Sequence, residues 1–123
     1  MTRIAPWLSV GNPVEALVFY GAGFAAIELE RLEDVVGEVA VAQLSIDGAE
    51  FWIQSDAGSS PDAVDGMSVR MILEVADPDS VLARAVAAGA TEVAPVADGY
   101  GWRIGRVADP SGHHWEIGKR LAT

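Results

Sequence analysis

The sequence predicts a single α+β domain built from two tandem β-α-β-β-β modules, which form a curved, half-open mixed sheet. Three observations predict this class. The length of 123 residues is typical of one domain. LSVGNPVEALVFYGAGF, which begins at Leu8, aligns with LEVADPDSVLARAVAAGA, which begins at Leu73. IDGAEFWI, which ends at Ile53, aligns with PSGHHWEI, which ends at Ile117.

The first module is expected to cover about residues 1–54. Asn12 and Pro13 are typical of a helix start, because the Asn12 side chain can accept from free amides and proline needs no N–H there. Gly23 is expected to end this helix in a left-handed conformation. Asp47-Gly48 predicts a tight hairpin turn. The expected elements are a helix at 13–22 and strands at 3–10, 25–31, 38–46 and 49–54.

The second module, about 67–123, follows a polar linker at 55–66, SDAGSSPDAVDG. Asp77 and Pro78 repeat the helix start, Gly89 is expected to end the helix, and the stretch 109–112 (DPSG) fits a type I turn. The expected elements are a helix at 78–88 and strands at 68–76, 91–97, 101–109 and 113–118. One module leaves its sheet open on one face, so two modules or two chains must enclose a ligand space together.

The composition excludes several classes of function. The absence of cysteine excludes disulfides, thiol nucleophiles and zinc–thiolate sites. A formal net charge of −10 argues against nucleic acid as a partner and favours a cationic or neutral small ligand. No apolar run is long enough to span a membrane, and the N-terminus lacks the shape of a signal peptide. We therefore expect a cytoplasmic protein.

Three stretches carry a resemblance to a known group: LSVGNPVEALVFY, ARAVAAGATEV and the ending YGWRIGRVADPSGHHWEIG. The ending is close to the YGDR…GRVRDPFGHxW pattern of PhnB-like proteins. Over nearly its whole length the chain resembles the vicinal oxygen chelate superfamily. This superfamily includes glyoxalase I, extradiol dioxygenases, fosfomycin-resistance proteins and bleomycin-resistance proteins.

The resemblance implies where a metal would bind. The metal-dependent members hold a divalent ion with His and Glu on four strands, and the matching positions in this chain are Ala5, Trp52, Arg70 and Glu116. Only Glu116 can ligate a metal, whereas a divalent ion needs three or four donors. We therefore expect no metal ligands of the family type and no cofactor, with a divalent metal as the alternative. Arg70 is expected to form a salt bridge with Glu116 instead.

Strand alternation adds neighbours to the expected cavity face. Trp7 and Trp52 can stack on a planar or cationic ligand, or can simply fill the space that a metal and substrate would occupy. His114 and Glu116 are weak candidates for acid–base catalysis. His113 and His114 point to opposite faces and cannot chelate together. The other side chains expected on this face are Ser9, Glu50, Gln54, Ile72 and Glu74.

The strand at 101–109 leaves its register open. A two-residue loop at Pro110-Ser111 would turn Arg103 inward and send Arg106 toward the core, which is costly for an unpaired charge. A bulge would reverse both directions. Trp102 and Arg103 are therefore possible ligand-binding residues.

Two functions follow. The first is a metal-independent protein that binds a drug or an aromatic or cationic metabolite, as bleomycin-resistance proteins do. The alternative is a metal-dependent lyase, isomerase or dioxygenase. The lost ligand set favours binding over catalysis. High mean hydropathy and half-open sheets predict a homodimer with cavities built from both subunits.

Overall fold

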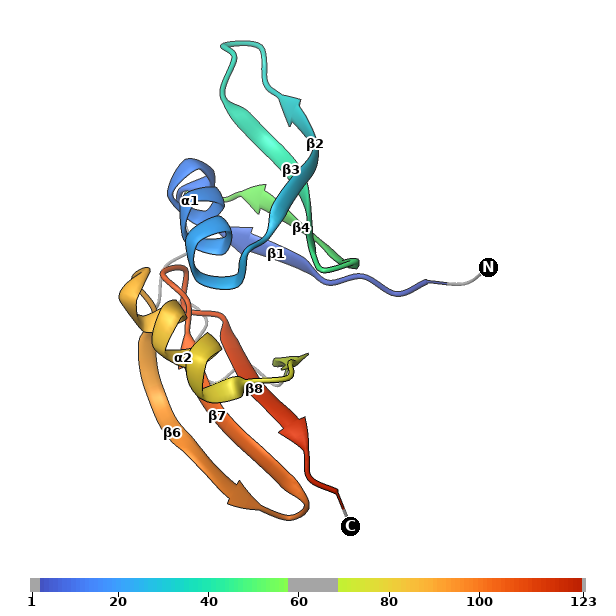
Figure 1. The fold of residues 1–123 in the computed structure, drawn as a ribbon. Helices are drawn as coiled ribbons and strands as arrows, with labels where there is room; N and C mark the ends of the chain where they lie inside the picture. The colour runs from blue at the N-terminus through green and yellow to red at the C-terminus, as the bar shows by residue number, and fades with distance from the viewer. Residues whose placement is uncertain (1–2, 58–68, 123) are drawn as a thin grey trace.

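The computed structural model describes residues 3–57 and 69–122. The first half contains β1 (Trp7–Val10), α1 (Pro13–Phe24), β2 (Ile27–Glu33), β3 (Val39–Ile46) and β4 (Ala49–Ser55). The second half contains β5 (Met71–Glu74), α2 (Pro78–Ala87), β6 (Thr91–Gly99), β7 (Trp102–Ala108) and β8 (His114–Arg120). The predicted repeat and the α+β class are confirmed (Figure 1). Residues 58–66 of the expected linker, and residue 68 of the next expected strand, lie outside the described part.

The strands form two separate four-stranded mixed sheets with the same topology. The order is β1-β4-β3-β2 in the first sheet and β5-β8-β7-β6 in the second. β1 pairs with β4 in parallel, and β5 pairs with β8 in parallel, whereas the other pairs are antiparallel. Each sheet thus begins with a short strand at its edge, β1 or β5.

Both helices begin as the sequence predicts. The side chain of Asn12 accepts from the amide of Glu15 at 3.1 Å, and that of Asp77 accepts from the amide of Ser80 at 3.2 Å. A proline occupies the first turn of each helix. Neither helix in the described part of the chain is long and apolar enough to cross a membrane.

The end of α1 differs from the prediction. Gly23 lies inside the helix, and the left-handed residue is Ala25, with φ of 56°. The amide of the next residue, Ala26, donates to the Tyr20 carbonyl at 3.0 Å. A Cβ atom at Gly23 would lie 3.5 Å from the Cα of Ala85 on α2. The glycine therefore allows the two helices to approach closely. Gly89 does adopt a positive φ, 122°, beyond α2.

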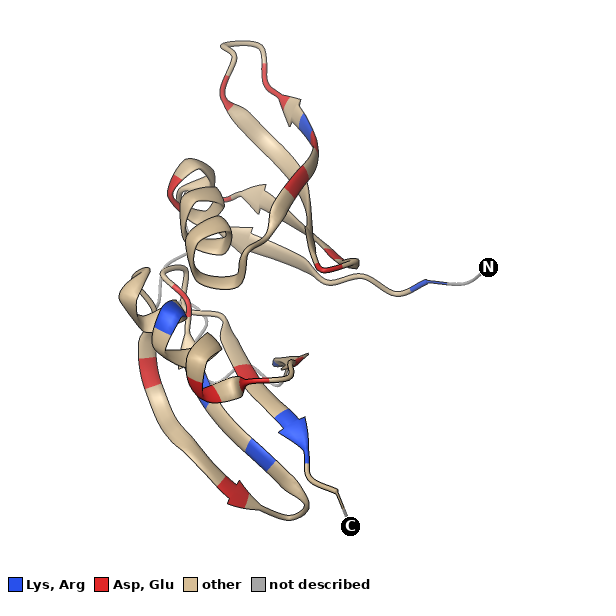
Figure 2. Ribbon diagram, viewed as in Figure 1, with Lys and Arg blue, Asp and Glu red and all other residues tan. Residues whose placement is uncertain are grey.

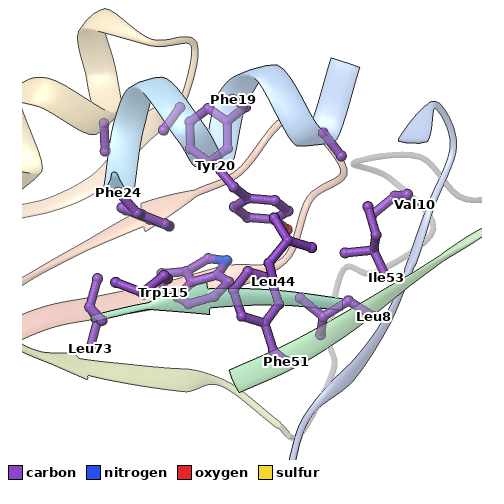
Figure 3. Close-up of a cluster of buried hydrophobic side chains, with 14 of the residues drawn as sticks. Leu8, Val10, Phe19, Tyr20, Phe24, Leu44, Phe51, Ile53, Leu73 and Trp115 are labelled. Atoms are coloured by element: carbon purple, nitrogen blue, oxygen red, sulfur yellow. The ribbon is translucent and has the colours of Figure 1, made fainter. Parts of the chain in front are cut away.

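One buried cluster contains side chains from both halves of the chain. Figure 3 shows Trp115 of β8 among Tyr20 and Phe24 of α1 and Phe51 of β4. The ring centroids of Phe24 and Trp115 are 4.9 Å apart. The helices and the helix-facing sides of both sheets therefore share their apolar packing.

A buried carboxylate strengthens this junction. Asp109 accepts hydrogen bonds from the Tyr20 hydroxyl at 2.6 Å and from the indole N–H of Trp115 at 2.9 Å. It also accepts from the amides of Ser111 and His113. Burial, and then the charge of Asp109, raise the pKa of Tyr20 well above its usual value. Tyr20 of the first half is thereby tied to the turn before β8.

Candidate functional site

Each sheet has one face that packs under the helices and an opposite face that the helices leave uncovered, here called the inner face. Burial alternates along β1, β4, β5 and β8 as the sequence predicts, with Leu8, Ile53 and Ile117 in the core. Alternation places Trp7, Trp52 and Glu116 on inner faces. The remaining inner-face side chains of these four strands include Ser9, Glu50, Gln54, Ile72, Glu74 and His114.

The inner face of the first sheet is aromatic and polar. Trp7 and Trp52 are register partners on β1 and β4, and their rings stack with centroids 5.8 Å apart and 25° between planes. Glu50 accepts from the Gln43 amide at 2.9 Å and from Arg3 at 3.1 Å. A hollow of about 460 Å³ lies beside Trp52, between Glu50 and the segment before β1. Trp7 remains half-exposed, so an indole face is accessible to a planar molecule.

The inner face of the second sheet carries a charged group of three. The Arg70 Nε lies 3.5 Å from one oxygen of Glu116, so the predicted salt bridge is present. An Nη of Arg106 donates to the other oxygen at 3.2 Å. Glu116 is therefore held between two guanidinium groups, only one of which the sequence led us to expect there.

The turn between β7 and β8 explains the presence of Arg106. The loop between Asp109 and His113 has three residues, and its last residue, Gly112, has φ of 90°. This combination of a type I turn and a left-handed residue shifts the register by one relative to a two-residue loop. Arg106 thus pairs with Glu116 across the strands and lies on the inner face. This is the alternative expected from a bulge, and it avoids the costly placement of Arg106 toward the core.

The same register turns Arg103 away from the inner face. Arg103 donates two hydrogen bonds to Asp79 of α2, at 2.6 and 2.8 Å, and one to Asp98 at 2.9 Å. These hydrogen bonds raise the pKa of Arg103, and those from Arg103 lower the pKa of Asp79. The structure therefore does not bring Arg103 together with the other predicted ligand-binding residues.

Trp102 lies at the far end of β7, opposite Arg120 of β8. The Arg120 guanidinium lies over its indole ring, 5.1 Å from the ring centroid. The ring already has a cationic neighbour from the protein itself. Its neighbours differ from those of Trp7 and Trp52, which lie on the other sheet.

A cleft of about 920 Å³ separates the edge strands β1 and β5. It is lined by Trp7 and Arg70 at its rim and by Phe51 and Trp115 of the core. Large apolar side chains along these two edges remain exposed, namely Ile4, Val69 and Ile72. The buried ring of His113 closes one side, with its Nε2 2.7 Å from the Ser9 carbonyl. The next residue, His114, points to the inner face. Among the described residues it makes no hydrogen bond to the other half of the chain.

The four positions that the resemblance matches to the metal ligands of the superfamily's enzymes do not carry a suitable set of donors. Ala5 and Trp52 offer no donor to a hard cation, and a guanidinium stands at Arg70. Within residues 3–57 and 69–122, no group of three His, Asp or Glu side chains converges in a way that could hold an ion. The donor set therefore does not fit a divalent metal of the family type.

Comparison with known proteins now assigns the family, because residues 7–118 match the family described as the glyoxalase-like domain. The chain belongs to the glyoxalase-like domain family. It is a member of the vicinal oxygen chelate superfamily, as its motifs indicated. An uncharacterized protein of Mycobacterium bovis, Mb0911c, is 36% identical over 124 residues, which cover 94% of this chain and 82% of that protein.

Solved structures show the same fold. TioX from Micromonospora sp. ML1 superposes with a TM-score of 0.77 at 24% identity, covering 98% of this chain and 100% of TioX. The fosfomycin resistance protein FosX from Listeria monocytogenes superposes with a TM-score of 0.75 at 16% identity, covering 100% of this chain and 94% of FosX. These likenesses establish the glyoxalase/bleomycin-resistance fold.

Proposed function

We propose that this glyoxalase-like protein binds a small planar aromatic molecule, a drug or a metabolite, without a metal and without transforming it. The proposal rests on the side chains found at the positions that the resemblance matches to metal ligands. Trp52 and its stacking partner Trp7 stand on one sheet, and an ion-paired Arg70 stands on the other. Stacked indoles supply a flat apolar surface, and this surface suits an aromatic ring better than a hard cation.

We further propose that two copies associate to complete the cavity. The described parts of β1 and β5 each pair with a single strand, and exposed Ile4, Val69 and Ile72 lie along the cleft between these edges. A second copy would cover these apolar side chains and enclose both inner faces. The negative charge is concentrated in residues 3–57, which carry nine acidic and two basic side chains, whereas 69–122 carry seven and six (Figure 2). Both halves are net negative, so the proposed contact depends on the apolar side chains.

Tryptophan fluorescence tests the binding proposal. A planar aromatic compound that does not absorb at the emission wavelength should quench the emission of chelator-treated protein in a saturable way. Trp52→Ala should weaken binding several-fold, since a stacked ring contributes about 0.5–1.5 kcal/mol. Tyr100→Asn is the matched control, because Tyr100 is a fully exposed aromatic residue in the β6–β7 turn. Equal affinity in wild type and Trp52→Ala would contradict the proposed site.

A further inference from the structure

The group of Arg70, Arg106 and Glu116 has more hydrogen-bond donors than acceptors. Two guanidinium groups carry ten N–H bonds between them. Among the described residues they form ion pairs with one carboxylate, that of Glu116. Only the Arg106 Nη makes a hydrogen bond to it, since the Arg70 Nε lies 3.5 Å away. The Nε of Arg106 is buried and has no hydrogen-bond partner among the described residues. Buried donors without a partner are costly, so this arrangement favours an additional acceptor.

The net charge of the group points to the kind of acceptor. Two arginines and one glutamate leave one positive charge, although the whole chain has a formal net charge of −10. The side chains are partly screened from water, with exposed fractions of 28% for Arg106 and 20% for Glu116. An anionic group is attracted more strongly at such a place than on an open surface. Guanidinium groups also match the planar geometry of carboxylates and the oxygens of phosphates.

We propose that the position of the superfamily's metal is an anion-binding subsite in this protein, built from Arg106 and Arg70 with Glu116 as their internal counter-ion. The aromatic ligand of the proposed function would carry a carboxylate or a phosphate-like group that the arginines bind. This inference rests on the proposed function and specifies its ligand: the ring stacks on the tryptophans, and the acidic group binds the arginines.

Three probes that share a naphthalene ring and carry an anionic, a neutral or a cationic substituent test the inference by calorimetry: 2-naphthoate, 2-naphthalenemethanol and 2-naphthylmethylamine. Wild type should bind naphthoate at least about tenfold more tightly than the alcohol, the gain expected of a charged hydrogen bond. Arg106→Gln should remove this preference, so that naphthoate and the alcohol bind the variant with similar affinity. Glu116→Gln should increase the affinity for naphthoate, because it removes the competing carboxylate.

The outcomes separate the two proposals. If the alcohol binds but naphthoate binds no better, the anion subsite is wrong and the aromatic site stands. If Glu116→Gln lowers the affinity for the amine and does not raise the affinity for naphthoate, Glu116 recognises a cation and the inference is overturned.

If none of the three probes binds, the proposed aromatic site is wrong. A titration with inorganic phosphate then tests the anion subsite by itself. The wild-type ¹H–¹⁵N signal of the Arg106 Nε should then shift with phosphate but not with chloride at equal ionic strength. This measurement needs no variant and thus does not depend on the variants folding. An unchanged signal would overturn the inference.

Discussion

Glu116 has two arginine partners of unequal exposure. The resemblance to the superfamily matches this residue to a metal ligand of the enzymes, whereas in this structure its carboxylate is bound by guanidinium groups. Arg106 is more buried and makes the hydrogen bond, and Arg70 is half-exposed and more distant. The two arginines should therefore contribute unequally to stability.

Arg106→Gln should destabilise the protein by about 1–3 kcal/mol, since it leaves a half-buried carboxylate without its hydrogen bond. Arg70→Gln should change the free energy of unfolding by less than about 1 kcal/mol, as is typical of an exposed ion pair. Urea unfolding followed by circular dichroism measures both. A larger loss for Arg70→Gln would show that Arg70, and not Arg106, is the principal partner of Glu116.

Tyr20 gives the protein a predicted sensitivity to alkaline pH. Its folded pKa lies above the unfolded value of about 10, because burial and Asp109 oppose the phenolate. The neutral hydroxyl therefore contributes stability that is fully present below about pH 10 and is lost as pH rises further. Urea midpoints between pH 8 and 11 should fall above pH 10.

Tyr20→Phe should lower stability at pH 8 and flatten the alkaline decline. Tyr100→Phe, at a fully exposed tyrosine, is the control and should leave the decline unchanged. An alkaline decline that is the same in wild type and Tyr20→Phe would contradict the role given to the Tyr20–Asp109 hydrogen bond.

Among the elements, α2 lies close to its sheet because β7 has a glycine beneath it. A Cβ atom at Gly105 would lie 2.6 Å from a methyl carbon of Leu82 and 3.0 Å from the Ala94 carbonyl. Gly105→Ala should therefore destabilise the protein by about 1–3 kcal/mol through overpacking. Gly99→Ala is the matched control, since nothing lies within 4 Å of its Cβ position. Thermal unfolding of both variants tests this, and equal melting temperatures would contradict the packing of α2 on β7.

The elements also show what local sequence can predict. Asp47-Gly48 gives the predicted two-residue turn, with φ of 50° and 93°, because both residue types tolerate the left-handed region. The type of the turn at 109–112 was predicted, and the left-handed Gly112 decides between the two registers that the sequence left open for β7. One residue of shift exchanges the faces of a strand, so Arg106 lies on the inner face and Arg103 does not.

The remaining differences arise from contacts between the two halves. The repeat predicts each module, but it contains nothing about the close approach of α2 to Gly23 inside α1. The buried Asp109 likewise gains Tyr20 as a donor only when the halves pack together. The inner faces were predictable because strand alternation is local, whereas the partners of Glu116 depended on the register of a neighbouring strand.

At the scale of the whole molecule, the open edges of the two sheets predict a homodimer. Ile72→Glu should shift the protein to a monomer, because it places a charge on the apolar rim of the cleft between β1 and β5. Val35→Glu is the control, since Val35 is fully exposed in the β2–β3 connection. Sedimentation velocity at micromolar concentration measures the effect, and a wild-type protein that sediments only as a 12.9 kDa species would contradict the prediction.

The central claim is that this member of the glyoxalase-like family binds its ligand without a metal. Calorimetric titration of chelator-treated protein with an aromatic carboxylate, before and after addition of equimolar Mn²⁺ or Zn²⁺, tests it most directly. We predict the same affinity under all conditions, since Arg70 and Arg106 take the metal's place beside Glu116. Binding that requires the metal, or conversion of the ligand once the metal is added, would contradict the claim.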